Sequence, residues 1–95
     1  MEAFAIIATH ELNPGSRQMW ADLAMINATE ARKENGCLQF DVLLPREAPD
    51  TGILVERYVD EDAWKWHFQQ RYCRDFMAAI ETMLVSKTRT LCDVE

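Results

Sequence analysis

The sequence of 95 residues lacks the features that mark several common classes of protein. It has only three glycines and three prolines and no repeated or low-complexity segment, which argues against a disordered or repetitive chain. Its first apolar run, residues 4–8, is short and follows an acidic residue. We therefore expect neither a signal peptide nor a membrane-spanning segment.

Cysteines and recognised cofactor motifs are also scarce. Cys37, Cys73 and Cys92 are far apart and do not have the spacing of a metal site. A reduced, cytoplasmic protein is the simplest interpretation. The sequence has no glycine-rich phosphate loop, zinc-type spacing or nucleotide-binding fingerprint, so we expect no cofactor.

Positive charge is scarce as well. The formal net charge is −6, and the ten lysines and arginines are scattered among acidic neighbours. Nucleic acids and anionic membranes attract clustered cationic surfaces, so neither is an expected partner.

What the sequence does contain is clear hydrophobic periodicity. Alternating apolar residues predict strands over 3–10, 37–44, 53–59 and 86–94. Helical spacing predicts a first helix over 17–35, ended by Gly36 in a left-handed conformation. A second helical region, capped by Asp60, runs to residue 85 with a break near Gln70 and Arg71.

This order, βαββαβ, predicts one α+β domain over residues 1–95 with a ferredoxin-like antiparallel sheet. The two predicted helices can cover only one face of a four-stranded sheet. The other face still carries apolar residues, so we expect a homodimer in which the sheets of two chains pack together.

Residues 53–67, ILVERYVDEDAWKWH, contain polar side chains in apolar surroundings. His67 shares a helical stripe with Trp64 and Phe68, which favours a general acid or base in an apolar pocket. Spacing alone somewhat favours the alternative, a partly buried structural histidine bonded to a backbone carbonyl. Glu56 and Tyr58 share one strand face with Leu54.

A carboxylate inside a strand needs a partner, and for Glu56 we expect Arg89, or Arg57 of a second chain. Tyr58 is a candidate hydrogen-bond donor to a substrate, although tyrosines in sheets more often only pack. His10, at the end of the first strand, is expected at the surface. Cys73 and Cys92 have no neighbouring base in the sequence, so neither is a predicted nucleophile.

Residues 34–43, ENGCLQFDVL, and 55–67, VERYVDEDAWKWH, resemble the motifs of the antibiotic biosynthesis monooxygenase family. The resemblance implies a dimeric α+β barrel with a pocket in each protomer between sheet and helices. It also implies that Glu56 matches the strand glutamate of the family and His67 the helix histidine that faces the pocket. Members include cofactor-free monooxygenases of quinols and polyketide aromatics, haem-degrading oxygenases and enzymes that process a phosphorylated autoinducer.

Two departures narrow the implied functions. The first strand has no asparagine where haem-degrading members use one, so haem degradation is not expected. Tyr72 replaces a second histidine of the family, which argues against a two-histidine mechanism. The leading hypothesis is a cofactor-independent monooxygenase of a small electron-rich aromatic, with His67 and Tyr58 as catalytic residues. Its predicted substrate-binding residues are Trp64, Phe68, Tyr72 and Glu56.

Two other functions stay open. The first is an isomerase or degradative enzyme for a small hydroxylated or phosphorylated metabolite, with His67 as a proton shuttle and Arg71 or Arg74 for the anion. The second is a non-catalytic dimeric binding domain with the same fold. An open cavity lined by His67 and a tyrosine would favour catalysis, whereas a site filled by Trp64, Phe68 and Met77 would favour the binding domain.

Overall fold

The computed structural model describes residues 3–95. Its elements, in chain order, are β1 (Ala3–Leu12), α1 (Arg17–Ala31), β2 (Cys37–Leu43), β3 (Thr51–Tyr58), α2 (Glu61–Gln69), α3 (Arg71–Ile80), the 3-10 turn η1 (Glu81–Met83) and β4 (Leu84–Val94). This is the predicted order, and the second helical region is divided into two α-helices at the predicted break near Gln70 and Arg71.

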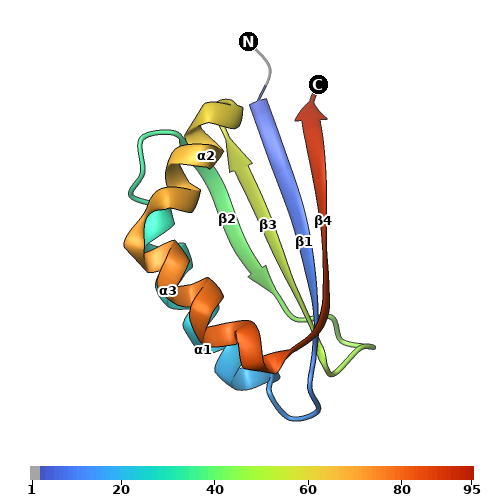
Figure 1. Ribbon diagram of the computed structural model, residues 1–95. Helices are drawn as coiled ribbons and strands as arrows, with labels where there is room; N and C mark the ends of the chain where they lie inside the picture. The colour runs from blue at the N-terminus through green and yellow to red at the C-terminus, as the bar shows by residue number, and fades with distance from the viewer. Residues whose placement is uncertain (1–2) are drawn as a thin grey trace.

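The strands form one antiparallel sheet in the order β2-β3-β1-β4. The three helices all lie against one face of this sheet (Figure 1). The predicted ferredoxin-like α+β fold is therefore confirmed.

The hydrophobic core lies between the sheet and α1. The side of α1 that faces the sheet is made of small residues around one large one, namely Trp20, Ala21, Ala24, Ala28 and Ala31. Alanines allow the helix to approach the sheet closely. Gly52 of β3 lies under the Trp20 ring, where an added Cβ would come within 2.4 Å of the indole.

Two predicted boundaries were wrong near the end of α1. The helix ends at Ala31 rather than at residue 35, and Gly36 does not have a positive φ. Gly36 is needed for another reason: a Cβ at this position would lie 2.6 Å from the Cβ of Ala63 on α2. The glycine therefore allows the segment after α1 to pass against the start of α2.

The beginning of α2 and the break after it follow the prediction. The Asp60 carboxylate accepts a hydrogen bond from the backbone N–H of Ala63 at 2.8 Å, as expected of an N-cap. Gln70 has an extended backbone with ψ of 146°, which separates α2 from α3. The chain changes direction at Gln70, so α2 and α3 are two separate helices.

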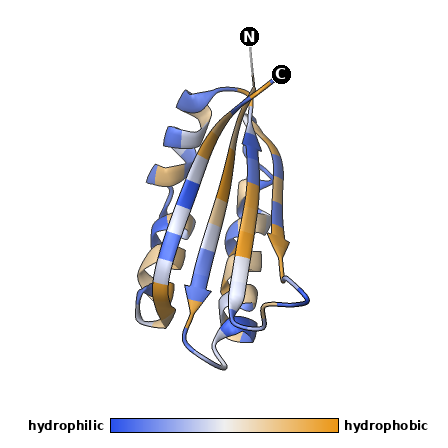
Figure 2. Ribbon diagram, turned by 90° about the vertical axis from the view of Figure 1, so that its right-hand side faces the viewer, coloured by the Kyte–Doolittle hydropathy of each residue, from blue (hydrophilic) through white to orange (hydrophobic). Residues whose placement is uncertain are grey.

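The face of the sheet opposite the helices is uncovered. Figure 2 looks onto this face, with the strands in front of the helices, and shows hydrophobic residues mixed with hydrophilic ones. Ile7 of β1 is 43% exposed, and Leu43 of β2, two strands away in the sheet, is also exposed. None of the helices in residues 3–95 combines the length and apolar character that crossing a membrane requires.

Candidate active site between the sheet and helices α2 and α3

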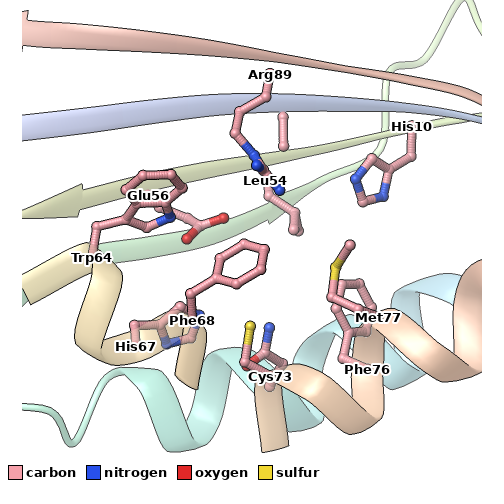
Figure 3. Close-up of a pocket in the computed structure, with 12 residues that line it drawn as sticks. His10, Leu54, Glu56, Trp64, His67, Phe68, Cys73, Phe76, Met77 and Arg89 are labelled. Atoms are coloured by element: carbon pink, nitrogen blue, oxygen red, sulfur yellow. The ribbon is translucent and has the colours of Figure 1, made fainter. Parts of the chain in front are cut away.

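A small cavity lies between the sheet and the three helices (Figure 3). Its volume is about 20 Å³, which accommodates a group the size of one water molecule. It is lined by Ala8, His10, Asn27, Leu54, Glu56, Trp64, His67, Phe68, Cys73, Phe76, Met77 and Arg89. Four predicted site residues are among them: Glu56, Trp64, His67 and Phe68.

His67 is held by a buried carboxylate. Its Nδ1 lies 2.6 Å from Oε2 of Glu34, and the residue is only 1% exposed. When Nδ1–H donates this hydrogen bond to the carboxylate, Nε2 is the unprotonated nitrogen of the neutral ring. A histidine oriented in this way by a carboxylate is the arrangement of a general base.

Glu34 is a candidate site residue that the sequence analysis did not name. It lies in the turn after α1, and its carboxylate also accepts a hydrogen bond from the hydroxyl of Tyr72. The turn is fixed by Arg32, whose guanidinium donates two hydrogen bonds to the backbone oxygen of Phe40 on β2, at 2.7 and 3.0 Å. Glu34 and His67 are far apart in sequence, so no local pattern connects them.

Glu56 makes a different contact from the one predicted. Its Oε1 accepts a hydrogen bond from the hydroxyl of Tyr58 at 2.7 Å, and no salt bridge to an arginine is found within residues 3–95. Burial raises the pKa of the Glu56 carboxyl above its ordinary value, although the Tyr58 hydroxyl, His67 and Arg89 oppose the rise. Glu56 therefore keeps its proton to a higher pH than an exposed carboxyl does.

The structure places neither predicted tyrosine on the cavity wall. Tyr58 is fully buried behind Glu56. Burial, followed by the charge of Glu56, raises the pKa of Tyr58 well above its usual range. Burial and the hydrogen bond to Glu34 likewise raise the pKa of Tyr72. Both phenols therefore stay protonated and donate to a carboxylate, so each acts on the site through its partner.

His10 was predicted at the surface, and this prediction was wrong. The side chain is 3% exposed and lines the cavity, because β1 continues past it to Leu12 and pairs with β3 and β4 on either side. Strand alternation contained the signal: Phe4, Ile6 and Ala8 are on the buried face, and His10 is the next residue on that face.

Three side chains separate the cavity from a hollow on the surface. The guanidinium of Arg89 lies 5.0 Å from the ring centre of Phe68 and 5.6 Å from that of Trp64. These three residues line both the cavity and the outer hollow, whose volume is about 410 Å³. The space on the far side of them is therefore large enough for an aromatic ring.

The cysteines do not have the surroundings of nucleophiles. Burial raises the pKa of Cys73, which lines the cavity, to about 12, and that of Cys37 to about 11. Both thiols are therefore protonated at neutral pH. Within residues 3–95, no three His, Cys, Asp or Glu side chains are grouped so that they could hold a metal ion.

The arginines considered for an anionic substrate lie outside the cavity. Arg71 is largely exposed and pairs with Asp75 at 3.7 Å, and Arg74 is also exposed. Neither lines the cavity, whereas Arg89, from β4, does. The two arginines named in the isomerase hypothesis are therefore not at the cavity, and Arg89 is the arginine that lines it.

The family model described as antibiotic biosynthesis monooxygenase matches residues 3–79, which include every site residue named above except Arg89.

The chain belongs to the antibiotic biosynthesis monooxygenase family. Solved structures of the same fold include a protein from Pseudomonas aeruginosa, with 21% identity and a TM-score of 0.92, which covers 100% of this chain and 96% of that one. A conserved protein from Methanosarcina mazei has 20% identity, a TM-score of 0.92, and coverage of 100% and 95%. A protein from Mycobacterium tuberculosis has 23% identity, a TM-score of 0.87, and coverage of 95% and 92%. No match is found among curated protein sequences.

Proposed function

We propose that this member of the antibiotic biosynthesis monooxygenase family is a cofactor-independent monooxygenase of a small electron-rich aromatic, such as a quinol. The observation that carries the proposal is the buried Glu34–His67 pair, whose Nδ1–Oε2 distance is 2.6 Å and whose two side chains are 4% and 2% exposed. A purely structural histidine needs only a hydrogen-bond partner. A buried carboxylate beside Nδ1 also stabilises the imidazolium that forms when Nε2 takes a proton.

In the proposed reaction, Nε2 of His67 removes the proton of a phenolic hydroxyl. The resulting anion supplies the electrons that reduce dioxygen, one oxygen atom is added to the ring, and the other leaves as water. For hydroquinone the products are hydroxyquinone and water, and no external reductant is needed. Arg89 lines the same cavity and places positive charge near the oxygen anions that form.

An aromatic substrate requires the cavity to open. The ring of Phe68 lies among the other lining side chains in Figure 3, and Phe68 is only partly buried. It is close to the end of α2, next to the extended Gln70. We infer that the Phe68 ring turns toward the outer hollow when substrate enters, and that Trp64 then stacks on the substrate.

Oxygen uptake tests this function. With hydroquinone and dihydroxynaphthalenes as substrates, the wild-type protein should consume oxygen without added cofactor. His67→Ala should lower turnover by about 10²- to 10⁴-fold, the range of a lost general base. Asp62→Asn, an exposed change on the same helix, should leave turnover unchanged. Equal turnover of the His67→Ala and wild-type proteins would refute the assignment.

A second candidate function rests on the size of the cavity. A volume of about 20 Å³, bounded by Trp64, Phe68 and Met77, also suits a binding domain of this fold whose pocket has closed. In that case no quinol would support oxygen uptake, and the His67→Ala protein would bind the same molecules as the wild type.

We further propose that the protein acts as a homodimer. Ile7, Leu43, Ile53 and Val55 lie on the uncovered face of the sheet, where pairing a second sheet would remove them from water. Ile7→Asp should convert the dimer to a monomer, as measured by light scattering after size-exclusion chromatography. Ile26→Asp is the matched control, because Ile26 is 63% exposed on α1, away from this face. A monomeric wild-type protein would contradict the proposal.

A further inference from the structure

Two polar side chains of the cavity have no part in the chemistry described above. His10 of β1 is 3% exposed and Asn27 of α1 is 2% exposed, and both line the cavity that His67 lines. Figure 3 shows His10 at the opposite end of this cavity from Trp64 and His67. The cavity therefore has a second polar end.

His10 presents a hydrogen-bond donor at this end. The indole N–H of Trp20 donates to Nδ1 of His10 at 2.9 Å, so the proton of the neutral ring is on Nε2. Burial, together with Lys87 and Arg89, lowers the pKa of His10 to about 4, which keeps the ring neutral near pH 7. No hydrogen bond from Nε2 is found within residues 3–95.

Asn27 presents an acceptor. Its Oδ1 is buried and accepts no hydrogen bond from any residue in 3–95. An unsatisfied buried acceptor costs about 1–3 kcal/mol, so a chain that keeps it for stability alone would gain by replacing it with an apolar residue. The polar group is instead suited to a bound molecule.

A hydroxyl group fits this pair of partners. It can accept one hydrogen bond from His10 Nε2–H and donate one to Asn27 Oδ1. A carbonyl or a carboxylate has no proton for Asn27, and an ammonium group has no lone pair for His10.

We propose that His10 Nε2–H and Asn27 Oδ1 bind a second hydroxyl of the substrate, remote from the hydroxyl that His67 deprotonates. This inference rests on the proposed function, and it narrows the substrate class to aromatics with two hydroxyl groups at opposite ends of the ring system. His10 and Asn27 determine specificity, while His67 carries out the proton transfer.

Binding without oxygen tests this assignment. Hydroquinone and 4-fluorophenol have similar size, but the fluorine of the second cannot donate a hydrogen bond and accepts one poorly. By anaerobic titration calorimetry, the wild-type protein should bind hydroquinone at least about tenfold more tightly. Equal affinities, or no binding of hydroquinone, would overturn the proposal.

Asn27→Leu separates a binding role from a structural one. This variant should lose the preference for hydroquinone and melt at a higher temperature, because the unsatisfied acceptor is gone. Thr51→Val is the matched control: it removes a buried hydroxyl that donates to Glu11 at 2.8 Å, away from the cavity. It should lower the melting temperature and leave the preference unchanged. If Asn27→Leu keeps the preference, Asn27 has no binding role.

The two proposals fail in different ways. If hydroquinone is preferred in the absence of oxygen but no oxygen is consumed when it is admitted, the monooxygenase function fails and the hydroxyl site stands. If oxygen uptake depends on His67 but both ligands bind equally, the function stands and the hydroxyl site fails. Nitrogen NMR gives an independent readout, because the signal of His10 Nε2 should shift with hydroquinone and not with 4-fluorophenol.

Discussion

Replacing Glu34 with glutamine tests whether the carboxylate orients His67, the proposed general base. The change keeps the size of the side chain but removes the charge that now accepts from His67 Nδ1 and from the Tyr72 hydroxyl. A neutral amide can also present an N–H to Nδ1, which favours the ring tautomer that has its proton on Nε2. His67 would then have no lone pair facing the cavity.

The expected magnitudes follow from the two hydrogen bonds. A hydrogen bond to a charged group is worth about 1–1.5 kcal/mol more than one between neutral groups, so losing the charge at both contacts should lower the free energy of unfolding by about 2–3 kcal/mol. Turnover should fall by about 10²- to 10⁴-fold, as expected when a general base is held in the wrong tautomer.

The assay combines oxygen uptake with chemical denaturation of the same samples. Glu30→Gln is the matched control, because Glu30 lies four residues earlier and pairs with Lys33 on the surface at 2.6 Å. That change should cost less than about 0.5 kcal/mol and leave turnover unchanged. If Glu34→Gln matched Glu30→Gln in turnover while His67→Ala was inactive, Glu34 would have no orienting role.

Two further predictions concern stability. Gly36→Ala should lower the free energy of unfolding by about 1–3 kcal/mol, because its Cβ would lie 2.6 Å from that of Ala63. The double variant with Ala63→Gly, measured by chemical denaturation, should recover part of this loss. If the effects of the two changes are simply additive, the clash is excluded. The pKa of His10 is about 4 in the folded chain and 6.5 ordinarily, so the unfolded chain binds more protons between these values. The contribution of His10 to stability is thus complete above pH 6.5 and is lost as the pH falls through about 4. Glu56, whose pKa is raised, changes stability with pH in the opposite direction, so the effect of His10 is measured by comparing wild type with His10→Phe. The difference between their melting temperatures should shrink as the pH falls toward 4. A difference that stays constant with pH would contradict this reasoning.

The sequence predicted the elements well wherever periodicity and capping agree. The four strands, the Asp60 cap and the break at Gln70 all follow from local patterns. The end of α1 was wrong because the role of Gly36 is set by Ala63, a contact between segments distant in sequence. Helical spacing also allows Met19 and Ile26 on an apolar face of this helix, but both are exposed, because the sheet packs on the alanine side.

The site was predictable only in part. His67 was found because a histidine on an apolar helical stripe is conspicuous, and Asn27 gave the same signal on α1 without being recognised. Glu34 begins the family-like motif over residues 34–43, but that motif does not connect it with His67, because their contact is a hydrogen bond between segments far apart in sequence. Only the folded chain brings Glu34 to His67, so the structure was needed to identify this carboxylate.

The most direct test is an anaerobic crystal structure of the protein with hydroquinone bound. One hydroxyl should lie within hydrogen-bond distance of Nε2 of His67, and the other should contact His10 Nε2 and Asn27 Oδ1, with the ring of Phe68 displaced toward the outer hollow. Hydroquinone bound only in that hollow, without contact to His67, would contradict the account.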